Sequence, residues 1–248
     1  MKILSYTNNK ITKKDYLFKG LNINLQKKNV ISFVGAGGKT TLIYNLGEEL
    51  KKFDKKVIIT TTTNMFISKK YFTSSNNLDE IAEKLKKDSI VVVGTPLENG
   101  KFTSINGLSC RQLSEICDFL LIESDGSRRL PLKAPDSHEP VIDDSSNMVV
   151  GVAGIDAIGN SIKNICHRKD IVSRILGADE CHIVNENDIA LLLSSEEGQM
   201  KYINKFGIHM EYTAVINKCD TDELIEKAKV AARFLNEKHI HNIITSLK

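Results

Sequence analysis

The stretch Ile31-Ser-Phe-Val-Gly-Ala-Gly-Gly-Lys-Thr-Thr41 places a glycine-rich turn between a β-rich run and an amphipathic helix. Glycines allow backbone N–H groups to surround phosphate oxygens, a following lysine reaches the β- and γ-phosphates, and the next hydroxyl ligates Mg²⁺. The pattern G-x-x-x-x-G-K-[ST] would place its first glycine at position 33, which is Phe33 here. The stretch still predicts a phosphate-binding loop formed by Gly35, Ala36, Gly37, Gly38, Lys39, Thr40 and Thr41. The alternative is a glycine-rich turn with a solvated lysine.

Composition limits the classes of function that need considering. The chain has 248 residues, 34 basic and 31 acidic side chains, and a formal charge of +3. With charges so nearly balanced, the protein has no strong positive potential to attract nucleic acid or an anionic membrane, so neither is expected as a partner. Because no apolar run has the length of a membrane span and residues 1–14 lack a signal-peptide stretch, we expect a cytoplasmic protein.

The five cysteines are scattered and include no Cys-x-x-Cys pair, which is typical of reduced intracellular thiols. Two Cys-His neighbours, at 166–167 and 181–182, suggest metal ligands. Neighbours on a strand point to opposite faces, however, so each pair offers one ligand to a shared ion. Ordinary core or surface positions are the competing and favoured interpretation.

Apolar patterning predicts strands alternating with helices after residue 28. Strands are expected at 30–34, 57–61, 90–93, 119–122, 148–152, 182–184 and 213–216. Helices are expected at 41–53, 78–87, 171–176, 188–193 and 224–235, with a short one after the capping-box spacing of Ser109 and Gln112. This order predicts an α/β fold: a mostly parallel sheet with helices on both faces and a P-loop NTPase architecture. Residues 1–28 are expected to form an amphipathic lead-in packed on the domain formed by 29–248.

Polar residues follow two predicted strands. Thr61 belongs to a run of four threonines after the second strand, where a metal or phosphate role competes with simple strand packing. Glu123 and Asp125 close a buried strand, and a carboxylate there suits Mg²⁺. The spacing Glu-x-x-Gly favours Glu123 as the metal carboxylate and Gly126 as a backbone donor to the γ-phosphate. An ordinary Asp-Gly turn is the alternative.

The basic residues Arg128, Arg129 and Lys133 follow that turn directly. These residues could neutralise the negative charge of a bound phosphate or bind a partner. Arg128 is the candidate for stabilising the charge of the transition state. A solvated loop is the other interpretation.

The string Asn217-Lys218-Cys219-Asp220 follows the predicted strand at 213–216. In GTPases, Asn-Lys-x-Asp reads guanine: the aspartate accepts from the base, the lysine stem covers the ring, and the asparagine braces the loop. Adenine offers no matching donors, which leaves a buried charge poorly satisfied. Alternatively, Asp220 or Thr221 caps the helix that follows.

Three segments together resemble the YqeC family: Leu121-Ile-Glu-Ser-Asp-Gly-Ser-Arg128, Leu132 to Pro140, and Gly151-Val-Ala-Gly-Ile-Asp156. The resemblance includes residues 34–41 and runs from about residue 30 to the C-terminus. It implies an accessory role in maturing selenium-dependent molybdenum hydroxylases. More distantly, Glu-x-x-Gly is similar to GTPases that insert nickel into hydrogenase and urease, within the signal-recognition-particle and MinD-like class.

These observations lead to one main hypothesis and two others. The main one is a Mg²⁺-dependent NTPase switch that prefers GTP over ATP and binds a molybdenum hydroxylase or its maturation factors, with a possible homodimer implied by the class that it resembles. Catalytic residues would be Lys39, Glu123, Asp125 and Arg128, and metal ligands Thr40, Glu123 and Thr61. The alternatives are a P-loop kinase acting on a small cofactor precursor and a non-catalytic scaffold stabilised by nucleotide.

Overall fold

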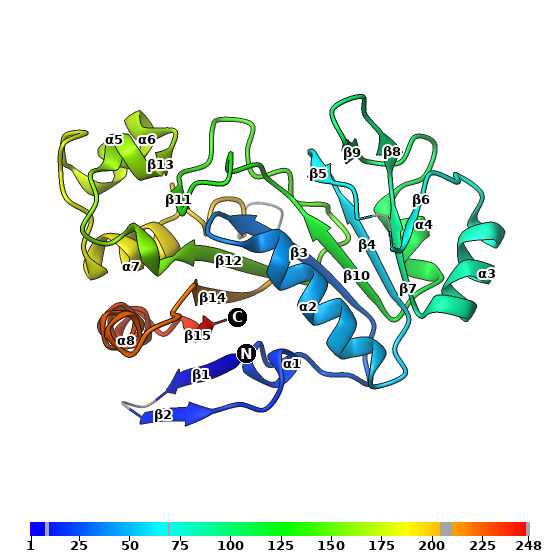
Figure 1. Cartoon of the computed structure of the whole chain (residues 1–248), viewed down its shortest axis with the longest axis horizontal. Helices are drawn as coiled ribbons and strands as arrows, with labels where there is room; N and C mark the ends of the chain where they lie inside the picture. Colours follow the sequence, from blue (N-terminus) through cyan, green and yellow to red (C-terminus); the bar gives the residue numbers. More distant parts are fainter. Residues whose placement is uncertain (8–9, 69, 204–209, 247–248) are drawn as a thin grey trace.

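A ten-stranded sheet organises the molecule in the computed structural model, which describes residues 1–7, 10–68, 70–203 and 210–246 (Figure 1). Its strands lie in the order β2 (Lys10–Lys13), β1 (Lys2–Thr7), β15 (His241–Ser246), β14 (Glu211–Asn217), β12 (Met148–Gly154), β3 (Asn29–Gly35), β10 (Phe119–Glu123), β4 (Val57–Thr61), β7 (Ile90–Val93) and β6 (Phe72–Thr73).

Pairing is parallel from β15 to β6, whereas β1 pairs antiparallel with both β15 and β2. The parallel part is buried on both faces, and its central strands are accordingly near-continuous apolar runs. Two smaller sheets lie outside this one: β5 (Met65–Phe66), β9 (Lys101–Thr103) and β8 (Thr95–Pro96) form the first, and β11 (Leu132–Lys133) and β13 (Cys166–His167) the second.

Helices cover both faces of the main sheet. The face that bears Ile31 and Phe33 packs against α1 (Leu17–Gly20) and α2 (Lys39–Lys51). The opposite face packs against α3 (Leu78–Asp88) and α4 (Cys110–Glu115) on one side, and against α7 (Glu186–Ser194) and α8 (Asp222–Glu237) on the other. The shorter elements η1 (Ile155–Ala157), α5 (Ile162–Ile165) and α6 (Lys169–Leu176) complete the chain. Within the described ranges, none of the helices combines the length and apolar character needed to cross a bilayer.

The sequence predictions of fold class and of most elements are confirmed. The expected helix at 41–53 begins two residues earlier, at Lys39, and the capping box of Ser109 and Gln112 is present at the start of α4. The predicted strand at 182–184 is wrong, because this segment makes only an isolated bridge between Ser161 and Ile183, and Ile183 is 54% exposed.

The N-terminal residues contribute more than was anticipated. They supply β1 and β2 to the main sheet, and Leu17, Phe18 and Leu21 are buried in the same core cluster as α2. The proposed division of the chain at residue 28 stays a prediction.

The sheet topology explains why the predicted motifs meet. Strands β4, β10, β3, β12 and β14 are parallel neighbours, so their carboxyl ends lie along one edge of the sheet. Glu123 pairs with both Phe33 and Thr61, and Gly154 pairs with Asn217. Ligands of open α/β sheets bind beyond this edge.

Candidate functional site: a phosphate loop beneath a basic cavity

The glycine-rich turn connects β3 directly to α2. Gly35, Gly37 and Gly38 have φ values of 95°, 78° and 112°, in the left-handed region that favours glycine. A Cβ on Gly37 would lie 2.2 Å from the backbone nitrogen of Gly154, and one on Gly38 would lie 2.6 Å from Asn217 Nδ2. Phe33 is fully buried within β3. The loop therefore begins at Gly35, which is why glycine is not needed at position 33.

Three N–H groups of the loop are already used within the protein, the first being that of Gly35, which donates to Asp125 Oδ2 (2.9 Å). Ala36 donates to the Val152 carbonyl (2.8 Å), and Gly37 donates to the Leu130 carbonyl (3.3 Å). The N–H groups of the first turn of α2 have no intrahelical acceptors, and Gly38, the residue before the helix, provides no side-chain cap. Lys39, Thr40 and Thr41 therefore offer a helix N-terminus suited to an anion.

Lys39 forms an ion pair with the buried carboxylate of Asp125, on the protein side of the loop. Its Nζ lies 3.0 Å from Asp125 Oδ1, and it also donates to the Gly35 carbonyl. Asp125 is fully buried, accepts from the Gly35 N–H (2.9 Å), and lies 3.1 Å from Lys133 Nζ. Burial lowers the pKa of Lys39, but the charges of Asp125 and Glu123 outweigh this effect and raise it above its ordinary value. The lysine is therefore kept charged.

Lys133 extends this buried charge network away from the loop. Its side chain is fully buried and its Nζ binds Glu139 (2.8 Å) and the Gly126 carbonyl (2.8 Å). Glu139 in turn accepts from Arg168 Nε (3.1 Å). Burial alone would raise the pKa of Glu139, but hydrogen bonds from Arg168 and Lys133 lower it to about 2. The interpretation of Lys133 as a solvated loop residue is wrong.

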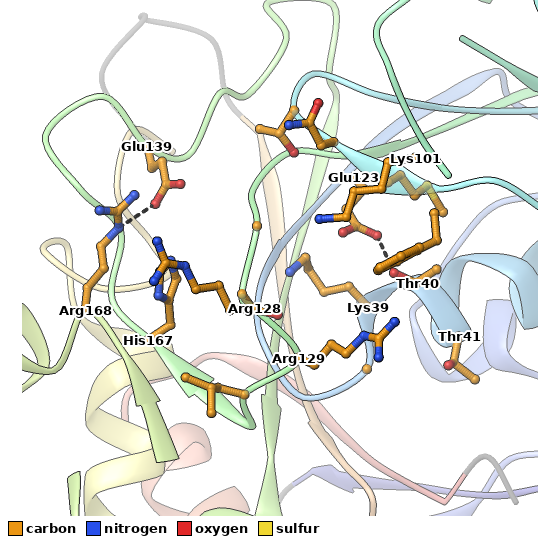
Figure 2. A pocket seen from close by; sticks show the side chains of 18 of the residues that line it. Lys39, Thr40, Thr41, Lys101, Glu123, Arg128, Arg129, Glu139, His167 and Arg168 are labelled. Carbon is orange, nitrogen blue, oxygen red and sulfur yellow. Dashed lines mark hydrogen bonds and ion pairs between the residues drawn. The ribbon is translucent and has the colours of Figure 1, made fainter. Parts of the chain in front are cut away.

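Thr40 and Glu123 form the pair expected of a magnesium site. Thr40 Oγ1 donates to Glu123 Oε2 (2.7 Å), so that an α2 hydroxyl and a β10 carboxylate meet beside Lys39 (Figure 2). Burial raises the pKa of Glu123, with Lys39 and Thr40 acting in the opposite direction. A hydroxyl and a carboxylate are hard oxygen ligands, and Mg²⁺ in phosphate sites needs one or two of these in addition to phosphate oxygens. The donor set fits the metal.

Thr61 occupies a different position from the one predicted. It is fully buried, donates to the Glu123 carbonyl (2.7 Å), and accepts from the Thr63 N–H (3.0 Å). It does not line the cavity described next, whereas Thr63 does. Thr61 therefore braces the end of β10.

A cavity of about 820 Å³ opens above the loop, extending from α2 to the β11–β13 region (Figure 2). Its lining includes His167, six basic side chains and two carboxylates. The basic side chains are those of Lys39, Lys101, Arg128, Arg129, Arg168 and Lys218, and the carboxylates are those of Glu123 and Glu139. A cavity with this charge balance suits an anionic ligand.

Arg128 and Arg129 enter this cavity from one tight turn. Both have positive φ, 49° and 64°, and the Leu130 N–H donates to the Ser127 carbonyl (2.9 Å) to close the turn. Within the described residues neither guanidinium has a carboxylate partner. Arg129 lies 4.6 Å from the ring centre of Phe66, which Lys101 approaches from 5.0 Å. The predicted basic cluster thus lies at the cavity, although Lys133 is behind it.

The Asn217 to Asp220 motif lies at the end of β14, beside the loop. Asn217 donates to the Gly37 carbonyl (2.8 Å) and accepts from Thr245 Oγ1 (2.9 Å). Lys218 lines the cavity and pairs with Asp156 (2.7 Å). Asp220 accepts from Ser246 Oγ (2.8 Å), and Thr221, not Asp220, is the N-cap of α8. The Asn217 side chain therefore stabilises the phosphate loop by a hydrogen bond. Of the two residues considered as the cap of the following helix, Thr221 is the one that caps it.

Several lining residues carried no signal in the sequence. Lys101 and Arg168 come from segments far from the predicted motifs, and Phe66 follows the threonine run without belonging to it; the first small sheet supplies Phe66 and Lys101, and the start of α6 supplies Arg168. The sequence offered Cys166 and His167 as metal ligands or, preferably, as ordinary core or surface residues; Cys166 is buried, and His167 lines the cavity. Among the residues that the structure describes, no group of three or more His, Cys, Asp or Glu side chains is arranged to hold a metal ion.

Together, the glycine loop between β3 and α2, the buried lysine and the hydroxyl–carboxylate pair define an α/β protein with a P-loop. A family profile described as "YqeC protein" matches residues 31–170. A relative from Escherichia coli (strain K12), named "Uncharacterized protein YqeC", is 33% identical over 195 residues, covering 74% of this chain and 75% of that protein. The chain belongs to the YqeC family.

Among the solved structures to which the chain is similar is the hydrogenase maturation factor HypB from Archaeoglobus fulgidus. It shares 16% sequence identity with this chain, and the superposition covers 89% of this chain and 82% of that one with a TM-score of 0.39.

Proposed function

We propose that this protein binds a magnesium nucleoside triphosphate, preferring GTP to ATP, and acts as an NTPase switch. The observation that carries the proposal is the hydrogen bond of Thr40 to Glu123 next to the buried Lys39. Phosphate-loop NTPases use a loop hydroxyl and a strand-end carboxylate in this way. Magnesium, when bound, would neutralise charge on the phosphate oxygens.

The residues of this chain divide the work as follows. Lys39 and the first N–H groups of α2 bind the phosphates, and Thr40 and Glu123 hold the metal directly or through water. Asp125 keeps Lys39 charged and positioned instead of touching the nucleotide, since it is fully buried behind the loop. Arg128 or Arg129 supplies the positive charge that a phosphoryl-transfer transition state requires.

Base recognition is assigned to Lys218 and Asp220, with Asn217 bracing the loop. The experiment is equilibrium binding of GTP and ATP to the wild-type protein and to Asp220→Ala, with Lys39→Ala as the variant that weakens both nucleotides. We expect Asp220→Ala to lose the preference for GTP while retaining ATP affinity. Equal or better ATP binding by the wild type would overturn the guanine assignment and leave the phosphate site intact.

Family resemblance supports a cellular role as a cytoplasmic accessory factor in maturation of a selenium-dependent molybdenum hydroxylase, with a nucleotide-dependent homodimer as one form of the switch. In a strain lacking this gene, hydroxylase activity should return with the wild-type gene and not with Lys39→Ala. Full rescue by Lys39→Ala would contradict a nucleotide switch.

A kinase is the second candidate, and the extent of the cavity favours it. The cavity continues past the loop to His167 and Arg168, so it has space beyond the phosphates for an acceptor. A kinase transfers phosphate to a small molecule, whereas a switch releases it into solution. Following the γ-phosphate of labelled GTP distinguishes the two.

A further inference from the structure

The cavity has an outer arm of which the nucleotide assignment uses no residue except Arg128, one of its two candidates for the charge at the transferred phosphoryl group. We define the outer arm as Arg128, Glu139, His167 and Arg168, which line the same cavity as Lys39. Figure 2 shows these four side chains grouped on the side of the cavity away from Thr40, Thr41 and Lys101. The outer arm is built from three separate segments: Arg128 comes from the loop before β11, Glu139 from the loop between β11 and β12, and the neighbours His167 and Arg168 from the end of β13 and the start of α6.

The turn that supplies Arg128 is conformationally costly. Two consecutive non-glycine residues, Arg128 and Arg129, adopt the left-handed conformation, which side chains with a Cβ rarely adopt. The turn is fixed to the phosphate loop, because the Leu130 carbonyl accepts from Gly37 and the Pro131 carbonyl accepts from Gly154 (2.9 Å). Glycine would fit both strained positions, yet long cationic side chains occupy them. The strain is consistent with a function for the guanidinium groups.

The two arginines point to different parts of the cavity. The Arg129 guanidinium lies over the Phe66 ring, and Figure 2 shows it on the side of the cavity that contains Thr40 and Thr41. Arg128 is directed toward His167 (Figure 2), and its charge is one of those that act on this histidine. We propose that the outer arm binds the carboxylate or phosphoryl group of a second, small anionic ligand, with Arg128 as its main cation and His167 as a hydrogen-bonding partner.

The pairing of the other charges explains why Arg128 is the main cation. Arg168 is already bound to Glu139 and Asp136, so its guanidinium is fixed and its charge largely balanced. Glu139 is shared further with Lys133. Arg128 has no such partner among the described residues, and a guanidinium binds planar carboxylate and phosphoryl groups through paired hydrogen bonds.

His167 provides a direct reporter of occupancy. Burial and the charges of Lys133, Arg168 and Arg128 lower its pKa, while Glu139 acts in the opposite direction. An anion bound between Arg128 and His167 would favour the protonated ring and raise that pKa. This inference rests on the proposed function, because it assigns a second ligand to the cavity that receives the nucleotide.

The experiment uses the full chain loaded with Mg²⁺ and a non-hydrolysable GTP analogue, so that the phosphate loop is occupied. Inorganic phosphate and malonate are titrated separately at constant ionic strength, and the His167 ring resonance, assigned with His167→Gln, is followed by NMR. Arg128→Gln is compared with the matched variant Arg129→Gln. The tighter of the two anions shows whether the natural ligand carries a phosphoryl or a carboxylate group.

We expect a saturable His167 shift and a raised His167 pKa in the wild type and in Arg129→Gln. Affinity should be about tenfold weaker in Arg128→Gln, equivalent to losing one charge-assisted hydrogen bond. Absence of a saturable shift with both anions, or equal weakening in both variants, would overturn the proposal.

The same experiment distinguishes failure of the proposed nucleotide binding from failure of the outer-arm proposal. If the GTP analogue does not bind, the proposed function fails, and the titration is repeated on the protein without nucleotide. A His167 shift that Arg128→Gln removes would still support the outer arm, whereas an unchanged His167 resonance would overturn it.

Discussion

Behind the phosphate loop, Asp125 lies fully buried between Lys39 and Lys133, whereas in front of the loop Arg128 and Arg129 extend into an open cavity without carboxylate partners among the described residues. The first region has every charge balanced and removed from water. The second has an excess of positive charge that a bound anion would balance. Substitutions behind the loop should therefore change folding stability, and substitutions in front should change binding.

The largest effect is expected for Asp125→Asn. It leaves the buried ammonium groups of Lys39 and Lys133 without their shared counter-charge, and removing one partner from a buried ion pair costs about 3–5 kcal/mol. Urea denaturation at neutral pH measures this change. The matched control is Asp156→Asn, because Asp156 pairs with Lys218 at the surface, where an ion pair contributes about 1 kcal/mol or less. Similar losses in the two variants would contradict the distinction between the regions.

Glu139→Gln should have the next largest effect, and the effect should depend on pH. The folded protein holds the pKa of Glu139 at about 2, below the ordinary 4.5, so the carboxylate stabilises the fold above pH 4.5. That contribution is at most about 3 kcal/mol at pH 7. It is lost as the pH falls from 4.5 through 2.

Denaturation midpoints measured from pH 7 to pH 3 test this prediction. The difference between wild type and Glu139→Gln should be constant down to about pH 5 and then shrink, because only the wild type loses the charge. A difference that grows on acidification would show that the pKa of Glu139 is raised instead.

In front of the loop, Arg128→Gly should stabilise the protein while weakening the outer arm. Glycine relieves the left-handed backbone at φ 49°, a gain of roughly 0.5–1 kcal/mol. Arg111→Gly, in the first turn of α4, is the control and should lose at most the roughly 1 kcal/mol that glycine costs in a helix interior. Thermal denaturation of both proteins measures these opposite changes. Destabilisation by Arg128→Gly would mean that the Arg128 side chain supports the fold.

The local part of this arrangement could be predicted from sequence, and the long-range part could not. The glycine loop, Thr40 and Glu123 follow from short patterns whose meaning lies within a few residues. The strand predicted at 182–184 is wrong because a short run of strand-forming residues does not reveal whether a neighbouring strand is available to pair with it. Strand β1 pairs with β15 from the opposite end of the chain, and no local pattern encodes that pairing.

The same limit applies to the site. Asp125 and Lys133 were both noted near the turn, but their burial depends on how β10 and β11 pack behind the loop. Arg168 reaches Glu139 across 29 positions of sequence, and His167 faces the cavity because β13 pairs with β11. Such contacts depend on tertiary structure, so the sequence predicted the phosphate loop and Arg128 but missed the placement of His167 and Arg168 beside that arginine.

The most direct test of the central claim is the magnesium dependence of nucleotide binding in Glu123→Gln. The glutamine oxygen still accepts from Thr40, and removing a buried carboxyl whose pKa is raised by burial should not destabilise the fold at neutral pH. We predict that Mg²⁺ strengthens GTP binding to the wild type and has little effect on the variant, which keeps its metal-free affinity. Equal enhancement by Mg²⁺ in both proteins would contradict the assignment of Thr40 and Glu123 as the metal site.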